Sequence, residues 1–380
     1  MLRLRLPMFD RRLGGLPRGS RCIFMTSPSI DPSTIGIHVA KAGLEEGYRT
    51  VYLVNNKPPV SVKRQARKAR LSFESHEQRG RFILVDSYSK LSGLESSEAH
   101  VVDPYNLDSI RETLLSLSSE NTLLVFDSVN SFLDAYGNEM EALISLLEAT
   151  GDSTVIALFS SWFYDSEMIR EVTNLFDGVF EVKPDPTLLV ENELRVKEAA
   201  WVTSFEELAF PIKIISPGEL RVYLPKVIVL GPYNAGKTTL IHALAEDAVS
   251  VERMGTTVAL DHGSLDYKGF YMEFFGTPGQ PQFDPMVDKM ADGAVGAILV
   301  VDSADPSSFR RAVELAKKCE SHGTPFVVAA NKQDLESALS PKDVKEALGL
   351  GPSTPVVGCS AKNRVNISLV LDVLLNILSA

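Results

Sequence analysis

A glycine-rich loop between an apolar run and a helical run limits the fold of this 380-residue chain more than any other feature. Residues 226–230 read KVIVL and residues 231–238 read GPYNAGKT, which matches the pattern GxxxxGK[ST]. A tight turn between a strand and the N-terminus of a helix points backbone N–H groups at phosphate oxygens, as in a βα unit of a mostly parallel sheet. The loop therefore predicts an α/β domain that binds phosphate.

Each part of this loop has an expected task. Gly231 and Gly236 leave room for the phosphates. The ammonium of Lys237 would lie between the β- and γ-phosphates, and the hydroxyl of Thr238 would coordinate Mg²⁺. A helix is expected over residues 239–247. The other predicted phosphate-site residues are Asn234, Ala235 and Thr239.

Two later strand ends predict which base is bound. The apolar run 326–330 is followed by NKQD and the run 356–359 by SAK. Guanine offers its N1–H and N2–H donors side by side, and the carboxylate of Asp334 can accept both. Adenine has an acceptor at N1 and would leave that charge unpaired. The sequence therefore predicts GTP and GDP as ligands, with Mg²⁺. The predicted base-site residues are Asn331, Lys332, Asp334, Ser360, Ala361 and Lys362.

Three of these residues have more specific expected roles. The stem of Lys332 can cover the face of the base, and Asn331 can brace the phosphate loop. The backbone amide of Ala361 can meet the guanine oxygen.

The length of the chain and its pattern predict two domains. Short β-branched runs alternate with amphipathic stretches in two series, which is typical of βα units, and 380 residues suffice for two cores. We place the boundary between residues 224 and 225, so the domains are 1–224 and 225–380. The expected strands are 21–25, 49–54, 81–85, 122–126 and 153–159, then 226–230, 271–275, 297–301, 326–330 and 356–359, with short strands in 184–224 and a terminal helix from residue 367.

Composition narrows the classes of function. A net charge of -11 argues against a general nucleic-acid binder, because phosphate neutralisation needs a basic face. The three cysteines are far apart and predict neither disulfides nor a zinc site, which fits a cytoplasmic protein. No run approaches the roughly 20 apolar residues of a membrane span, so we expect no direct membrane insertion.

Five short runs resemble the motifs of the Ras-like small GTPases over residues 225–380. In order along the chain they are GPYNAGKTT, GTT, GTPGQ, NKQD and CSAK. The runs ERMGTTVALDHG and YMEFFGTPGQPQF are similar to the prokaryotic small GTPases related to MglA, which work with roadblock-type proteins. The resemblance implies a Ras-like fold. It also implies a roadblock-type regulator or another protein effector as a partner.

The resemblance implies roles for the segment after the first helix of this domain. A switch threonine of the family contacts Mg²⁺ and the γ-phosphate, and the alignment points to Thr257, with Thr256 as the other candidate. Arg253 lies just before them and could act as an arginine finger in cis. Its alternative role is that of an exposed loop cation.

The GTPGQ run departs from the family pattern in one place. The usual Asp-x-x-Gly is here Gly276-Thr-Pro-Gly279, so the carboxylate that holds Mg²⁺ through water is missing, as in the MglA-like branch. Gly279 resembles the glycine whose amide meets the γ-phosphate, and Gln280 resembles the residue that orients the attacking water. The predicted catalytic residues are Gln280, Thr257 and Lys237, and the predicted metal ligands are Thr238 and Thr257.

Residues 8–224 resemble KaiC-like and RadA-like members of the RecA ATPase superfamily, beginning with FDRRLGGLPRGS before an apolar strand. Where that family has its phosphate loop, this chain reads SPSIDPST, without both glycines and the lysine. Pro32 removes a backbone donor as well. Asn56 and Lys57 replace the family's paired catalytic glutamates, although Asp127 keeps the acidic position of the second nucleotide motif.

The sequence thus predicts an α/β protein of two tandem P-loop-type domains with mostly parallel sheets, first RecA/KaiC-like and then Ras-like. The first domain is expected to be a catalytically inactive interaction module for partners or RecA/KaiC-like subunits, with weak ATP binding as the alternative. The second is expected to be a GTP switch with slow hydrolysis that a partner stimulates. The alternative is a GTP-sensing scaffold, or pseudo-GTPase, that never cycles.

Overall fold

The computed structural model describes residues 1–380 except 138, 186–191, 204–207, 246, 253–258 and 380. The chain forms two compact units, Met1–Val222 and Tyr223–Ala380. Strand β10 (Glu219–Leu230) contains the residues at which the first unit ends and the second begins. The predicted boundary at residues 224 and 225 therefore lies within a strand and not in a linker.

The first unit is built on a sheet whose central strands are all parallel. Its order is β4-β3-β2-β5-β6-β1-β7, and β8 and β9 continue it in the antiparallel sense, followed by the first residues of β10. The strands are β1 (Arg21–Thr26), β2 (Arg49–Val54), β3 (Phe82–Asp86), β4 (His100–Val101), β5 (Thr122–Phe126), β6 (Thr154–Phe159), β7 (Gly178–Pro184), β8 (Asn192–Ala199) and β9 (Leu208–Ser216).

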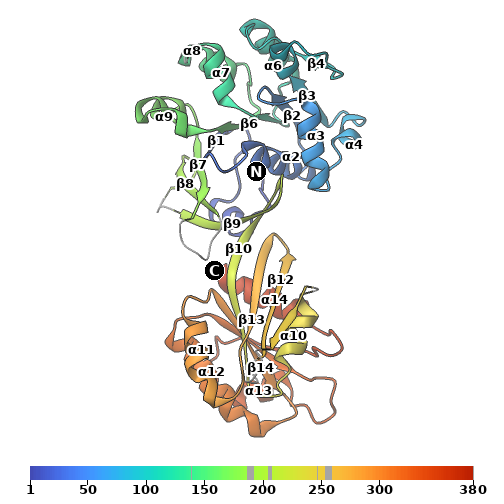
Figure 1. The fold of residues 1–380 in the computed structure, drawn as a ribbon, viewed down its shortest axis with the longest axis vertical. Helices are drawn as coiled ribbons and strands as arrows, with labels where there is room; N and C mark the ends of the chain where they lie inside the picture. Colours follow the sequence, from blue (N-terminus) through green and yellow to red (C-terminus); the bar gives the residue numbers. More distant parts are fainter. Residues whose placement is uncertain (138, 186–191, 204–207, 246, 253–258, 380) are drawn as a thin grey trace. The chain divides into compact units, whose positions relative to one another are not determined.

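Helices cover both faces of this sheet (Figure 1). Helix α2 (Pro32–Glu45) packs on β2, β5 and β6 with α3 (Pro59–Lys68) beside it, and α6 to α9 pack through their buried residues on the core of the opposite face. The remaining helices are α1 (Pro7–Leu13), α4 (Phe73–Glu77), α5 (Tyr88–Ser92), α6 (Leu107–Leu117), α7 (Val129–Ala135), α8 (Met140–Glu148) and α9 (Ser166–Thr173).

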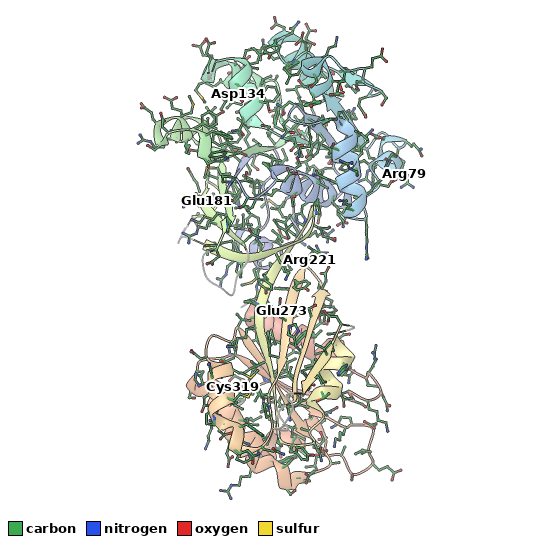
Figure 2. All side chains as sticks on the ribbon, viewed as in Figure 1. Arg79, Asp134, Glu181, Arg221, Glu273 and Cys319 are labelled. Atoms are coloured by element: carbon green, nitrogen blue, oxygen red, sulfur yellow. The ribbon has the colours of Figure 1, made fainter. Side chains whose placement is uncertain are left out.

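The second unit has the strand order β11-β12-β13-β10-β14-β15-β16. The part from β10 to β16 is parallel, and β11, β12 and β13 form antiparallel pairs. Figure 2 labels Glu273 on β13, where it accepts a 2.7 Å hydrogen bond from the hydroxyl of Tyr223 on β10. The strands are β11 (Val249–Glu252), β12 (Ala259–Tyr267), β13 (Phe270–Gly276), β14 (Gly296–Asp302), β15 (Phe326–Asn331) and β16 (Val356–Gly358).

Helices α10 and α14 contact each other and the sheet, whereas α11, α12 and α13 contribute to the core cluster of the other face. Their bounds are α10 (Lys237–Leu244), α11 (Asp284–Ala291), α12 (Phe309–Ser321), α13 (Pro341–Ala347) and α14 (Ile367–Leu378). Both units thus have mostly parallel α/β sheets, and the predicted fold class is confirmed. Within the described ranges, no helix is long and apolar enough to cross a membrane.

In the second unit one predicted boundary was wrong and one strand was missed. The first helix ends at Leu244 and not at residue 247, because the chain turns into the edge strand β11. The hairpin partner β12 was not predicted at all. Its pattern ALDHGSLDY does not alternate cleanly, because glycine and polar residues interrupt the apolar positions.

A buried histidine ties the first unit together. His38 on α2 is 5% exposed, its Nε2 lies 2.7 Å from the carbonyl oxygen of Leu4, and the N–H of Leu220 donates to its Nδ1 at 3.2 Å. Because Nδ1 accepts, Nε2 must carry the proton, so the ring is neutral. Burial lowers the pKa of His38 to about 4.

This histidine should make the first unit sensitive to acid. Its folded pKa lies below the unfolded value, so the unfolded chain takes up the proton first as the pH falls, and stability is lost between about pH 6.5 and 4. At pH 5 the loss should be about 2 kcal/mol. His38→Gln, which does not titrate, should remove this component from urea unfolding curves followed by tryptophan fluorescence. Both tryptophans, Trp162 and Trp201, lie in this unit.

His100→Gln is the matched control, because His100 is a partly exposed histidine on β4 of the same unit. It should keep the full acid sensitivity of the wild-type chain. Equal losses between pH 7 and pH 5 in wild type and His38→Gln would contradict the assignment.

Candidate functional site

The predicted phosphate loop joins β10 to α10 and is packed so tightly that its glycines cannot be replaced. A Cβ on Gly231 would lie 2.2 Å from the carbonyl oxygen of Val300, and one on Gly236 would lie 2.4 Å from Nδ2 of Asn331. Gly236 also has a φ of 96°, which side-chain-bearing residues rarely adopt. The loop therefore has the close backbone approach that its sequence predicts.

Lys237 lies at the floor of this loop. Its ammonium donates to the carbonyl oxygens of Gly231 at 3.0 Å and Pro232 at 2.8 Å. Burial lowers the pKa of Lys237 to about 8; the carboxylate of Asp261 raises this pKa and the cation of Arg311 lowers it further. A partly buried ammonium with few charges around it is suited to an anionic ligand.

A cavity of about 530 Å³ opens over the loop. It gathers predicted residues from three segments that are far apart in the sequence. Those lining it are Asn234, Gly236, Lys237, Thr238, Thr239, Gly279, Gln280 and Lys332, together with the unpredicted Asp261.

Asn331 connects the phosphate loop to the predicted base site. Its Nδ2 donates to the carbonyl oxygen of Ala235 at 2.9 Å, and its Oδ1 accepts from the N–H of Ala361 at 2.9 Å. Asn331 is 3% exposed, so both contacts are shielded from water. Asn331 therefore contacts the phosphate loop as expected, and the Ala361 amide, which we expected to meet a guanine oxygen, donates to Asn331.

Asp334 is exposed in the NKQD run after β15, next to Ser360. The hydroxyl of Ser360 donates to Oδ1 of Asp334 at 2.6 Å and holds the pKa of that carboxyl below its usual range. Lys332, which we expected to cover the base, has its ammonium 2.6 Å from Oδ2 of Asp302. Lys362 is exposed beside these residues.

Asp261 on β12 is the residue that the sequence analysis missed. It is 5% exposed, and its carboxylate accepts hydrogen bonds of 2.5 Å from the hydroxyls of Thr238 and Ser250. A Cβ on Gly276 would lie 3.2 Å from Oδ2 of Asp261, so this carboxylate occupies the space beside the glycine that replaces the usual aspartate. The available signal was an acid in the run TVALD, across the hairpin from an unexpected glycine.

Gly279 is pressed against the phosphate loop. A Cβ on it would lie 2.6 Å from the backbone N of Tyr233 and 2.7 Å from the carbonyl oxygen of Gly231. Gln280 follows it at the cavity. The other predicted switch residues, Thr256, Thr257 and Arg253, lie outside the described residues.

The degenerate loop of the first unit is filled by its own side chains. The carboxylate of Asp31 caps α2 by accepting from the N–H of Ser33 at 3.0 Å, and the ammonium of Lys57 lies 2.9 Å from the same carboxylate. Gln65 donates to it at 2.9 Å. Burial would raise the pKa of Asp31, but Lys57 and Gln65 hold it below its usual range.

Asp127, at the acidic position of the second nucleotide motif, is also hydrogen-bonded within the unit. The hydroxyl of Ser33 lies 2.7 and 2.8 Å from the two carboxylate oxygens of Asp127, which is fully buried. Burial raises the pKa of Asp127 to about 7. The carboxylate of Asp127 therefore bonds internally, to the residue that stands where the phosphate loop of the family has its lysine.

Known proteins resemble each half of the chain separately. A family model described as the ADP-ribosylation factor family matches residues 219–378, and one described as the KaiC ATPase matches residues 3–185. The "Uncharacterized protein MJ1339" of Methanocaldococcus jannaschii is 36% identical over 138 residues, which are 36% of this chain and 86% of that protein. The rat ADP-ribosylation factor-related protein 1 is 33% identical over 131 residues, which are 32% of this chain and 65% of that protein.

Two further matches are more distant or more partial. Translation initiation factor IF-2 of Desulfitobacterium hafniense is 31% identical, but only 21% of its length is covered. The crystal structure of the KaiC-like protein PH0186 from Pyrococcus horikoshii aligns with a TM-score of 0.45 at 18% identity, over 58% of this chain and 97% of that one. By its identity to the Methanocaldococcus jannaschii protein, the chain belongs to the same family as that protein, and by the two family models it carries an N-terminal KaiC-like ATPase domain followed by a C-terminal small GTPase domain of the ADP-ribosylation factor family.

Proposed function

We propose that this protein is a GTP-binding switch that hydrolyses GTP slowly and whose hydrolysis a protein partner accelerates. The observation that carries the proposal is the double hydrogen bond of Asn331, which joins the phosphate loop at Ala235 to the Ser360-Ala361 loop beside Asp334. It brings a cradle for phosphate and a carboxylate for guanine into one site.

The donor set near the loop fits a magnesium ion. A threonine hydroxyl and a buried carboxylate lie 2.5 Å apart, at Thr238 and Asp261, and oxygen ligands of this kind suit Mg²⁺. We infer that these two residues hold the ion, with Asp261 replacing the aspartate missing at Gly276. When bound, the ion would neutralise charge on the phosphate oxygens.

Gln280 supports cycling over constitutive binding. It lies at the cavity directly after Gly279, where its amide can orient a water for attack. A site of this type without an arginine finger turns over on the order of 10⁻⁴ per second, and a finger adds about 10³ to 10⁵. The Gly276-Thr-Pro-Gly279 run favours the MglA-like branch, whose members work with roadblock-type proteins. The proposed regulator is therefore a roadblock-type protein, and the proposed place of action is the cytoplasm.

The first unit is proposed to be an interaction module without ATP turnover. Its support is the Asp31 carboxylate at the N-terminus of α2, which places a negative charge where an ATP phosphate would need to bind. Pro32 at the same turn lacks the backbone N–H that a phosphate loop uses. Protein partners or KaiC-like subunits are the proposed ligands of this unit.

Changing the base-selecting carboxylate tests the ligand directly. Asp334→Asn should weaken GTP binding roughly 100-fold, because two hydrogen bonds to a charged acceptor are lost. The variant should gain affinity for xanthosine triphosphate, whose base carries a carbonyl at position 2 that the new amide can meet. Isothermal titration with GTP, xanthosine triphosphate and ATP measures both effects.

Asp343→Asn, at an exposed residue in the first turn of α13, is the control and should bind like wild type. A wild-type chain that prefers ATP, or binds no guanine nucleotide, would refute the proposed ligand.

Moving the carboxylate across the hairpin tests the metal site. Asp261→Ala should abolish the gain in GTP affinity on adding Mg²⁺. Gly276→Asp alone should be poorly tolerated, because its Cβ would lie 3.0 Å from that of Asp261. The double variant Asp261→Gly/Gly276→Asp, which also removes the Cβ at position 261, should recover the Mg²⁺ dependence, measured as the ratio of affinities with Mg²⁺ and with EDTA. An unchanged ratio in Asp261→Ala would remove this residue from the metal site.

Hydrolysis separates the switch from a scaffold that never cycles. Single-turnover GTP hydrolysis by the full chain should be slow and should fall by roughly tenfold or more in Gln280→Leu. A roadblock-type protein should accelerate the wild type. Tight GTP binding without hydrolysis, alone or with that partner, would favour the scaffold instead.

A further inference from the structure

One cation holds both ends of the segment that carries Gln280. Nε of Arg311 on α12 donates to the carbonyl oxygen of Gly279 at 3.3 Å. Its two terminal nitrogens bond the two carboxylate oxygens of Asp284, the first residue of α11. Gln280 lies between these two anchored positions.

The contact is built for a fixed geometry. The side chain of Arg311 is 12% exposed, and Glu314 accepts a further bond from it at 3.1 Å. The planar guanidinium can grip a carboxylate with two parallel bonds and a carbonyl with a third, which a lysine cannot do. The bond from Arg311 holds the pKa of Asp284 below its usual range, as expected for a carboxylate that stays ionised in this pair.

The opposite side of the segment is fixed by the phosphate loop. Gly279 packs so closely on the backbone of Pro232 and Tyr233 that a Cβ would lie 2.6 Å from each. Gly279 is therefore held between the phosphate loop and Arg311. The described contacts of Gln280 itself are local, with Gln282 donating to its side chain at 3.3 Å and Phe283 to its carbonyl at 3.1 Å.

We propose that Arg311 is a positioning residue for GTP hydrolysis, which holds Gln280 at the mouth of the phosphate cavity by binding Gly279 and Asp284 together. This inference rests on the proposed function. Arg311 is not among the described residues that line the cavity, so it acts through the segment and not on the nucleotide. Its loss should therefore change the rate of hydrolysis and leave nucleotide affinity nearly unchanged.

The test is a double-mutant cycle in the full chain. Arg311→Ala should slow single-turnover GTP hydrolysis by roughly 10- to 100-fold, because small displacements of a reacting group cost that much. Its affinity for GDP should stay within about threefold of wild type, an effect too small to account for that loss. In a Gln280→Ala background the same change should have no further effect, since residues that act through one another are not additive. Arg311→Lys should remain slow, because it restores the charge without the fork.

Two neighbours serve as controls. Arg310→Ala removes the same charge from the adjacent position, whose side chain is 92% exposed, and should hydrolyse like wild type. Lys318→Ala removes an ion pair of 2.6 Å from α12 to Asp288 on α11 and a longer one of 3.8 Å to Asp284, but leaves the bond to Gly279 in place. It should also hydrolyse GTP like wild type.

Equal rates in Arg311→Ala and Arg310→Ala would overturn the inference, as would full additivity with Gln280→Ala or a wild-type rate in Arg311→Lys. A wild-type chain that binds no guanine nucleotide, or never hydrolyses it, would instead refute the proposed function and the inference with it.

Discussion

The nucleotide cavity depends on the side-chain amide of Asn331. It satisfies a backbone carbonyl at Ala235 and a backbone N–H at Ala361, both buried, and leaving either unpaired would cost about 1–3 kcal/mol. The same amide occupies the volume that a side chain at Gly236 would need. One residue at the end of β15 thus sets the distance between the phosphate cradle and the base loop.

Local patterns were sufficient to predict the parts of this site that lie on single loops. The GxxxxGK[ST] run gave the position of the loop, and apolar runs gave most strands to within a residue, because parallel strands buried on both faces leave a continuous hydrophobic signal. The edge strand β11 and its partner β12 left no such signal. Asp261 could not be found from spacing either, because its place beside Gly276 depends on which residues of β12 and β13 face each other.

Gly276 and Asp261 illustrate how a carboxylate beside the phosphate loop can come from a neighbouring strand. The sequence shows an absence, a glycine where the related GTPases have an aspartate that holds Mg²⁺ through water. The structure shows a carboxylate from the neighbouring strand in hydrogen-bond contact with Thr238. A group missing from its usual position is therefore not evidence that the site lacks it, since any strand that passes the same point can supply it.

The degenerate loop of the first unit depends on one shared carboxylate. Lys57 and Gln65 both donate to the carboxylate of Asp31, so the loss of Asp31 would take a bond from each of them. Restoring a glycine or a lysine in this loop would leave a resident carboxylate that repels phosphate, and removing the carboxylate alone would strand the ammonium of Lys57. Asp31 thus couples three separate positions of the chain, so that a change at Asp31 alters the surroundings of Lys57 and Gln65 together.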